Sequence, residues 1–226
     1  MSKKLNLALI LAMVLLLPIT GLAGNYFDKV NYKGAFGSSN WIRGWTAVDD
    51  YNMLKEKESG SGQEVITDSD IEAGESVHWT SDKTYVLDGL VFVEEGAELN
   101  IEAGTVIKAK SGTDPATALI ISQGAKIFAE GTANNPIIFT SENDDISDPM
   151  DLSYDTRGTW GGVIILGKAT LNEEATDGIS YVEGIEEESD RTRFGGNNDK
   201  DNSGVLRYVS IRHGGIALAP GDEING

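Results

Sequence analysis

Short apolar segments separated by glycine-containing turns dominate the chain from residue 68 onward. Each segment spans only a few residues and is rich in β-branched side chains, a pattern that predicts β-strands. A helix needs a longer periodic stretch without glycine, and only residues 181–188 approach that pattern. The sequence therefore predicts an all-β fold, with strands at 76–80, 84–87, 90–93, 99–101, 105–109 and 119–121.

One sequence motif recurs along the chain: an apolar run, a glycine turn and a second apolar pair. Residues 90–104 align with residues 119–131, and a third copy at 163–171 is placed by its glycine, Gly167. A fourth and weaker copy covers residues 204–215. Repeats of roughly 20–50 residues that consist of short strands predict a β-solenoid. In such a fold each coil adds one strand to each of several long parallel sheets. The alternative is a β-sandwich or jelly roll. In these folds the same sequence motif rarely recurs with its strands and turns in equivalent positions.

The domain organisation follows from changes in composition. Residues 63–226 are predicted to form the solenoid, with polar loop insertions near 141–158 and 183–203. Residues 24–62 form an aromatic and glycine-rich lead-in or cap, followed by a charged Ser/Gly linker. The four tryptophans, two in this cap and two in the repeats, are interpreted as cap and core aromatics, with sugar-stacking platforms as the alternative. They are Trp41, Trp45, Trp79 and Trp160.

Residues 1–23 have the features of a secretory signal peptide. Lys3 and Lys4 precede an apolar run that ends at Pro18, and Gly21 and Ala23 are the small residues of a cleavage site. The apolar run is shorter than the roughly 20 residues that span a bilayer. We therefore predict an exported protein with no membrane span after signal cleavage.

Charge and cysteine content narrow the function classes. The chain holds 18 basic and 36 acidic residues, a formal net charge of −18, and no cysteine. Nucleic acids and anionic membrane surfaces are excluded as partners because both require a cationic surface. Disulfides, thiolate metal sites and cysteine nucleophiles are excluded as well. An acidic exported chain fits secretion or the outer surface of a Gram-negative bacterium, with the periplasm as the alternative.

Three segments of the predicted solenoid resemble a known protein family. Residues 131–141 (GTANNPIIFTS), 160–167 and 206–215, together with the aromatic lead-in at 34–46, resemble secreted right-handed parallel β-helix proteins of the pectate-lyase-like superfold. Proteins of this kind have no assigned activity and are found in Bacteroidota and related marine bacteria. The resemblance implies a right-handed parallel β-helix over nearly the whole exported chain. It also implies an incomplete solenoid at the C-terminal end, because longer members continue past a stretch like residues 221–226, and self-association through the open end is expected.

The segment that precedes Gly204 contains a candidate calcium site. Asp199, Asp201 and Ser203 repeat the opening of a calcium loop, in which hard oxygen ligands at alternate positions converge on one cation. The closing glutamate of such a loop is missing, since Ser210 stands at its position. The alternative interpretation is a solvated acidic turn. No other cofactor is predicted.

The acidic residues of the two insertions are interpreted as solvated loop residues, with a cation-dependent groove as the alternative. A lyase would need calcium carboxylates and a basic residue, and Asp199, Asp201 and Arg212 supply these residue types. A glycosidase would need two facing carboxylates. His78 and His213 lie in or beside predicted strands, and His213 is interpreted as a turn or stacking residue, with a general base as the alternative.

No catalytic residues follow from the sequence. The predicted function is an extracellular or cell-surface β-helix module with a structural, adhesive or glycan-binding role. Its partners would be extracellular polysaccharide or cell-surface components. The alternative is a calcium-dependent polysaccharide lyase or glycoside hydrolase.

Overall fold

The structure is a computed structural model that describes residues 36–37, 39–43, 45–46, 60–153, 155–172, 176–185, 189–219 and 222–223. The chain divides into two compact units, residues 1–41 and 42–226. The predicted signal peptide and most of the predicted lead-in lie outside the described residues. No helix in the described part of the chain has the length and apolar character needed to cross a membrane.

All strands belong to the second unit, and no α-helix occurs among its described residues. Among the described residues one 3-10 helix, η2, covers Thr176–Gly178. The strands are β1 (Gly62–Ile66), β2 (Ser76–Trp79), β3 (Lys83–Leu87), β4 (Leu90–Val93), β5 (Glu98–Ile101), β6 (Val106–Ala109), β7 (Ala118–Ile121), β8 (Lys126–Glu130), β9 (Ile137–Ser141), β10 (Gly162–Ile165), β11 (Ile179–Tyr181), β12 (Arg193–Gly195), β13 (Gly204–Arg207), β14 (Val209–Ile211), β15 (Ala217–Ala219) and β16 (Asp222–Glu223).

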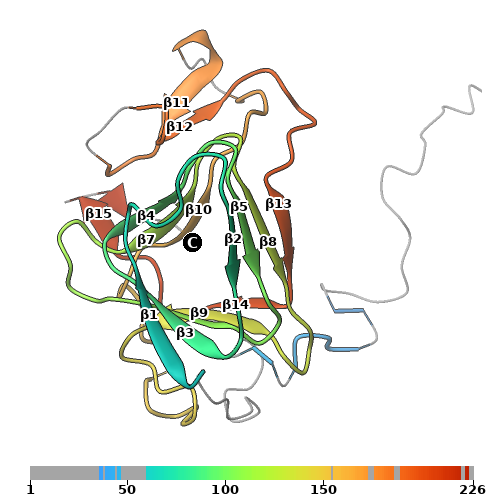
Figure 1. The fold of residues 1–226 in the computed structure, drawn as a ribbon, viewed down its shortest axis with the longest axis vertical. Coiled ribbons are helices and arrows are strands. Elements are labelled where there is room, and N and C mark those ends of the chain that lie inside the picture. Colours follow the sequence, from blue (N-terminus) through green and yellow to red (C-terminus); the bar gives the residue numbers. More distant parts are fainter. Residues whose placement is uncertain are drawn as a thin grey trace, which may run out of the picture. The chain divides into compact units, whose positions relative to one another are not determined.

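Three parallel sheets form the sides of a solenoid (Figure 1). Sheet A has the order β1-β3-β6-β9-β14, sheet B the order β2-β5-β8-β13, and sheet C the order β4-β7-β10. Each coil runs from sheet B to sheet A to sheet C, so the coil itself makes the connection that parallel strands require. The prediction of an all-β, right-handed parallel β-helix is confirmed.

The core consists of inward-facing side chains that stack in ladders along the solenoid. In sheet A, Tyr85, Ile107 and Phe139 occupy equivalent positions in successive strands, and all three are almost completely buried. The ring of Trp79 stacks on Tyr85 at 4.8 Å, which ties sheet B to sheet A inside the first complete coil. Burying side chains of this size contributes about 1.5–3 kcal/mol each, so these ladders are a main source of stability.

The predicted strand positions agree with the structure to within a residue at their ends. Residues 90–93 form β4 as predicted, whereas the strand predicted at 76–80 ends at Trp79. The N–H of Thr80 donates to the hydroxyl of Tyr85 (2.8 Å), which removes it from the strand ladder. The helix-like pattern at 181–188 does not give a helix among its described residues, because Tyr181 ends β11.

Two details of the repeat alignment are wrong. In sheet C, Val163 pairs with Leu119, so Lys168 and not Gly167 lies at the level of Gly124. The peptide of Gly167 instead accepts a hydrogen bond from the side chain of Gln123 (2.7 Å). The fourth copy, residues 204–215, contributes strands to sheets B and A, whereas the other three copies have their apolar runs in sheet C.

Two long connections cover parts of the outer surface. Residues 142–161 connect β9 to β10, and Ile146 packs on the outward-facing Val106 and Ile138 of sheet A. Residues 166–203 connect β10 to β13 and contain the antiparallel pair β11–β12. Apolar side chains of this second connection cover the outer face of sheet C around Phe92 and Ile120; they are Leu166, Val182, Ile185 and Phe194.

The last coil is less tightly enclosed than the others. Ile165, Leu206 and Ile211 face inward, in line with buried residues of the preceding strands, yet they are 41%, 45% and 48% exposed. Their strands, β10, β13 and β14, are each the terminal strand of a sheet. The described residues of this coil therefore present both an apolar face and strand edges.

Candidate binding site on the outer face of sheet A

A small cavity opens on the outer face of sheet A, near β1. Side chains alternate along each strand, so Thr84 and Lys108 face outward while Tyr85 and Ile107 enter the core. Strand register places Gln63 of β1 beside Thr84 of β3. It also places Val86 of β3 beside Lys108 of β6, one step further along the sheet.

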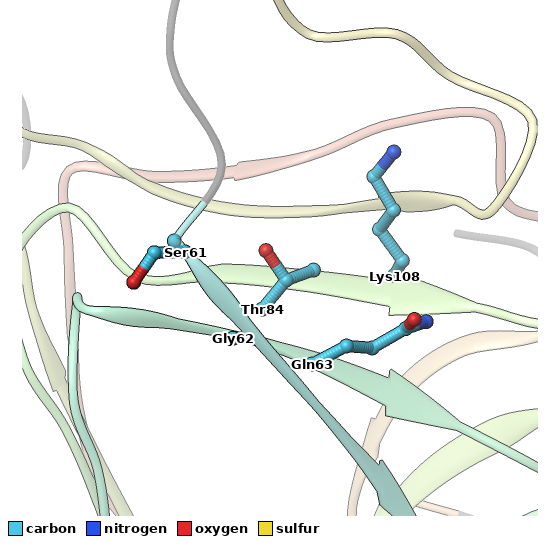
Figure 2. Close-up of a pocket in the computed structure, with 6 residues that line it drawn as sticks. Ser61, Gly62, Gln63, Thr84 and Lys108 are labelled. Atoms are coloured by element: carbon cyan, nitrogen blue, oxygen red, sulfur yellow. The ribbon is translucent and has the colours of Figure 1, made fainter.

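The cavity has a volume of about 270 Å³ and is lined by Gly60, Ser61, Gly62, Gln63, Thr84 and Lys108 (Figure 2). Figure 2 shows Thr84 between Ser61 and Lys108, with the carboxamide of Gln63 on the same side as Lys108. The lining consists of hydroxyl, amide, ammonium and backbone groups. We call this feature the outer cavity.

Glycine at position 60 is required for the wall of the outer cavity. A Cβ atom on Gly60 would lie 2.4 Å from the backbone nitrogen of Lys83, which is closer than any real Cβ contact. The chain can enter β1 this close to β3 only because the side chain is absent. Residues 60–62 therefore form one side of the cavity as backbone, with Thr84 beside them.

Thr84 supplies an unused polar group to the lining. The residue is 6% exposed, and its hydroxyl is buried with no hydrogen-bond partner among the described residues. Most buried hydroxyl groups in proteins are paired, and an unpaired one costs about 1–3 kcal/mol. The Thr84 hydroxyl is therefore an unpaired polar group beneath the surface of the cavity, closed to solvent.

Lys108 supplies the cation of the outer cavity. Its ammonium group donates to the carbonyl oxygen of Asp144 (2.7 Å) and has no carboxylate at ion-pairing distance in the described part of the chain. Several other lysines are ion-paired: Lys83, Lys110, Lys126 and Lys168. The charge of Lys108 also acts on the neighbouring loop, where hydrogen bonds from Ser147 chiefly lower the pKa of Asp145 and Lys108 lowers it further.

A buried charge cluster positions the carbonyl group that holds Lys108. Asp144 is 3% exposed, and its carboxylate accepts a hydrogen bond from Thr140 and lies 3.6 Å from the guanidinium of Arg212. Arg212 also donates from Nε to the hydroxyl of Ser210 (3.2 Å). The loop after β9 is therefore anchored to β9 and to the residues around β14, which fixes the amine of Lys108 at the cavity.

The predicted calcium residues lie elsewhere, in the second connection. Asp199 accepts a hydrogen bond from the N–H of Thr170 (2.9 Å), and Asp201 accepts one from the N–H of Lys168 (2.8 Å). Hydrogen bonds from the backbone and hydroxyl of Thr170 hold the pKa of Asp199 below its usual value. These two carboxylates hold the two ends of the connection together.

Ser203 and Gly204 lie directly against β8. The carbonyl of Ser203 accepts the N–H of Ile127 (2.9 Å). A Cβ on Gly204 would lie 1.8 Å from the carbonyl oxygen of Ile127, so this position also requires glycine. Among the described residues, no group of three or more His, Cys, Asp or Glu side chains is arranged to hold a metal ion. The calcium site stays a prediction.

Of the lyase-like combination, Arg212 faces Asp144, whereas Asp199 and Asp201 accept the N–H groups of Thr170 and Lys168. The interpretation of the insertion acids as solvated loop residues is wrong for Asp144, which is 3% exposed and faces Arg212. Several other acidic residues accept short-range hydrogen bonds within turns, as expected for loop residues. Asp145 bonds Ser147, Asp151 bonds the N–H of Asp145, and Asp155 bonds Ser153. Residues 186–188 of the second acidic stretch lie outside the described residues.

The histidine and tryptophan candidates can be compared with their positions in the structure. His213 has a positive φ of 58° and places its Nδ1 2.8 Å from the carbonyl of Thr156, which confirms its prediction as a turn residue. Trp45, Trp79 and Trp160 are buried, as predicted for cap and core aromatics. That interpretation is wrong for Trp41, which is 56% exposed and makes an edge-to-face contact with Phe36 in the first unit.

Sequence reasoning missed the outer cavity. The available signal was Lys108, a charged residue inside the apolar run 105–109 whose neighbours on both sides are core residues. Alternation alone predicts that this lysine faces outward. Its proximity to Thr84 and Gln63 depends on the register between coils, which the sequence does not specify locally.

Comparison with known proteins gives one family match. Residues 70–226 match the model of a family described as a pectate-lyase like beta helix domain. The searches of curated proteins and of solved structures gave no significant match. The matched region contains Thr84 and Lys108 but begins after β1, so residues 60–63 of the outer cavity lie outside it.

Proposed function

The chain belongs to the family of pectate-lyase-like β-helix domains, and we propose that it is an exported module that binds an extracellular glycan at the outer cavity. The module would serve a structural or adhesive role. The family supports a carbohydrate-related extracellular role in general, and the polar lining of the outer cavity supports our choice of this location.

The observation that carries this proposal is the ammonium group of Lys108, held by the carbonyl of Asp144, in a surface cavity with a polar lining. Glycans present many hydroxyl and acid oxygens, and they are recognised by a few well-placed polar groups in a concave site. Gln63 adds a carboxamide to the same lining. The outer cavity therefore offers several hydrogen-bond donors within a space of ligand size.

The lining favours binding over catalysis. A glycosidase places two carboxylates across the scissile bond. The residues that line the outer cavity include no carboxylate, and Asp144, the nearby buried one, faces Arg212. A polysaccharide lyase or hydrolase on this scaffold is the alternative that the following experiment also tests.

The test is a binding screen of the purified chain on a panel of neutral and anionic polysaccharides, followed by calorimetric titration of those that bind. We expect Lys108→Gln and Gln63→Ala to weaken binding about tenfold each, since the first removes the positive charge and the second the carboxamide of the lining. The matched control is Lys126→Gln, which removes a half-exposed lysine on the outer face of sheet B. This control should bind like the unchanged chain.

Two results would contradict the proposal. One is the absence of binding to every polysaccharide, and the other is binding that both cavity variants leave unchanged. Incubation with the same panel, followed by assays for unsaturated products and for reducing ends, tests the enzymatic alternative. Turnover that Lys108→Gln abolishes would replace the binding role by a catalytic one.

Export is tested separately from binding. We expect the protein recovered outside the cytoplasm to start at Gly24, as the proposed cleavage after Ala23 requires. N-terminal sequencing of the exported protein gives this result directly. A protein that retains residues 1–23 would contradict the signal-peptide prediction.

A further inference from the structure

We infer that residues 42–46 act as a clamp on the Tyr208 corner, residues 207–209, where the chain turns from β13 into β14. The clamp precedes β1 in the sequence, whereas the corner belongs to the last coil. The order of the last coil therefore depends on a segment that precedes the first strand. This device concerns the conformation of the solenoid and does not depend on the proposed function.

The clamp is a single turn with two buried apolar side chains. The N–H and the hydroxyl of Thr46 both donate to the carbonyl oxygen of Ile42 (3.3 Å each), which closes the turn. Ile42 and Trp45 are each 7% exposed. The ring of Trp45 meets the ring of Tyr208 edge to face, with the ring centres 5.2 Å apart. Because this geometry is favourable for aromatic pairs, the contact stabilises the corner in its folded position.

Tyr208 has a backbone conformation that disfavours its side chain. Its φ is 47°, in the left-handed region where a bulky L-residue is uncommon. The carbonyl of Tyr208 accepts the N–H of Ile137 (3.0 Å), and the carbonyl of Arg207 accepts the N–H of Gly131 (2.8 Å). Glycine or asparagine would make these backbone bonds with less strain. The contact with Trp45 therefore gives the tyrosine a role that its backbone bonds do not require.

The last coil is the part of the solenoid that gains most from an outside contact. Its strands β13 and β14 are terminal in sheets B and A, and their inward-facing Leu206 and Ile211 are nearly half exposed. A coil held by one neighbour opens more readily than a coil held by two. A clamp on its corner adds a contact that is lost when the coil opens.

The chain between the clamp and β1 is long enough for this arrangement. In sheet A, β1 and β14 are the first and last of five strands, four strand spacings of about 4.8 Å apart. Residues 47–59 join Thr46 to Gly60, and an extended chain of that length spans considerably more than this distance. The contact of Trp45 with Tyr208 thus joins the chain that enters the first strand of sheet A to its last strand.

The experiment is amide hydrogen exchange of the purified chain, followed by NMR at single residues. The amides of Gly131 and Ile137 report on the corner, because they donate to Arg207 and Tyr208. We expect Trp45→Ala to speed exchange at both amides about tenfold, which corresponds to about 1.4 kcal/mol.

Two controls restrict this effect to the last coil. The amides of Glu98 and Glu102 donate to carbonyl groups of the first complete coil, and Trp45→Ala should change their exchange by less than about twofold. Trp41→Ala removes a ring that is 56% exposed, and it should leave both sets of amides unchanged.

A second variant separates the clamp from the strain at Tyr208. Asparagine tolerates the left-handed conformation better than tyrosine, so Tyr208→Asn would slow exchange at the corner if strain alone mattered. We expect it instead to speed exchange by about the same factor as Trp45→Ala. The double variant should exchange no more than about twofold faster than either single variant, since both substitutions remove one contact.

Four results would overturn the inference. They are unchanged exchange at the corner in Trp45→Ala, an equal loss of protection in the first coil, an equal effect of Trp41→Ala, and slower exchange in Tyr208→Asn. An equal loss in the first coil would mean that Trp45 stabilises the whole fold and not the corner. Effects of Trp45→Ala and Tyr208→Asn that multiply in the double variant would likewise show that the two rings act independently.

Discussion

The carboxylate of Asp144 lies 3.6 Å from the guanidinium of Arg212, and both side chains are almost completely buried. Asp144 belongs to the loop that follows β9, and Arg212 follows β14 in the next coil. The pair therefore anchors the loop that covers sheet A to the neighbouring coil. The backbone of the same Asp144 holds Lys108, so the stability of this loop and the geometry of the outer cavity depend on one residue.

Removing this carboxylate should destabilise the protein strongly. We expect Asp144→Ala to lower the free energy of unfolding by about 3–5 kcal/mol, because a nearly buried guanidinium loses the charge that faces it. Denaturant unfolding measures the change. The control is Asp190→Ala, which breaks the largely exposed pair with Arg193 and should cost less than about 0.5 kcal/mol. Equal effects of the two substitutions would contradict the anchoring role of Asp144.

Arg191 fastens the second connection to the first coils of the solenoid. Its guanidinium lies 3.9 Å from the centre of the Phe92 ring, 2.7 Å from Glu94 and in contact with Asp68. These contacts join residues that are far apart in sequence and cover the outer face of sheet C. Ion pairs at this exposure contribute little each, whereas the contact with the ring adds about 0.5–2 kcal/mol.

We expect Arg191→Ala to lower the melting temperature by about 3–6 °C, which corresponds to about 1–2 kcal/mol for a domain of this size. Arg191→Lys should recover only part of the loss, since lysine lacks the planar group that stacks on Phe92. Arg207→Ala is the control, because Arg207 forms a longer and more exposed pair with Glu130. A full rescue by lysine would show that the charge alone matters.

The repeated strands could be predicted because their cause is local. In residues 90–93 and 118–121, β-branched and apolar residues form short runs bounded by turns, and each run is buried by its copy in the next coil. The register is fixed by the same stacking. The error at Gly167 arose because a glycine was used to align a coil whose register is fixed instead by the pairing of Val163 with Leu119.

The hairpin and the outer cavity could not be predicted because their causes are not local. The pairing of β11 with β12 is supported by Phe194 of β12, which packs against the cluster of Phe92, Ala118 and Ile120 from much earlier coils. From their spacing alone, the carboxylates of Asp199 and Asp201 could either bind a cation or accept hydrogen bonds from backbone N–H groups. Only the folded position of residues 168–170 shows that the carboxylates accept backbone hydrogen bonds.

The bond between Asp199 and Thr170 should depend on pH. Because the pKa of Asp199 is lowered in the folded state, its contribution is fully present above the ordinary aspartate pKa of about 4. It is lost as the pH falls through the lowered value. We expect protection of the Thr170 amide against hydrogen exchange to decrease in this range below about pH 4. Asp199→Asn should lower this protection at neutral pH and remove its pH dependence; an unchanged profile would contradict the prediction.

Calcium binding at Asp199, Asp201 and Ser203 can be tested by measuring the melting temperature of the protein with and without calcium. Since one oxygen of each carboxylate already accepts a backbone N–H, we expect millimolar calcium to leave the melting temperature unchanged. A rise of several degrees with calcium that Asp201→Asn abolishes would instead establish the calcium site. Magnesium at the same concentration controls for the general effect of divalent ions on an acidic chain.

The inward-facing residues of the last coil give the final prediction. Leu206 and Ile211 are nearly half exposed, and their strands are terminal in sheets B and A. Exposed apolar surface beside open strand edges favours pairing with another chain. We therefore expect the purified protein to self-associate in a concentration-dependent manner, as measured by light scattering after size-exclusion chromatography. Leu206→Glu should shift it to the monomer, whereas Val205→Glu, one residue away on the outer face of sheet B, should not. A protein that stays monomeric at all concentrations, or equal effects of the two substitutions, would show that this face does not mediate association.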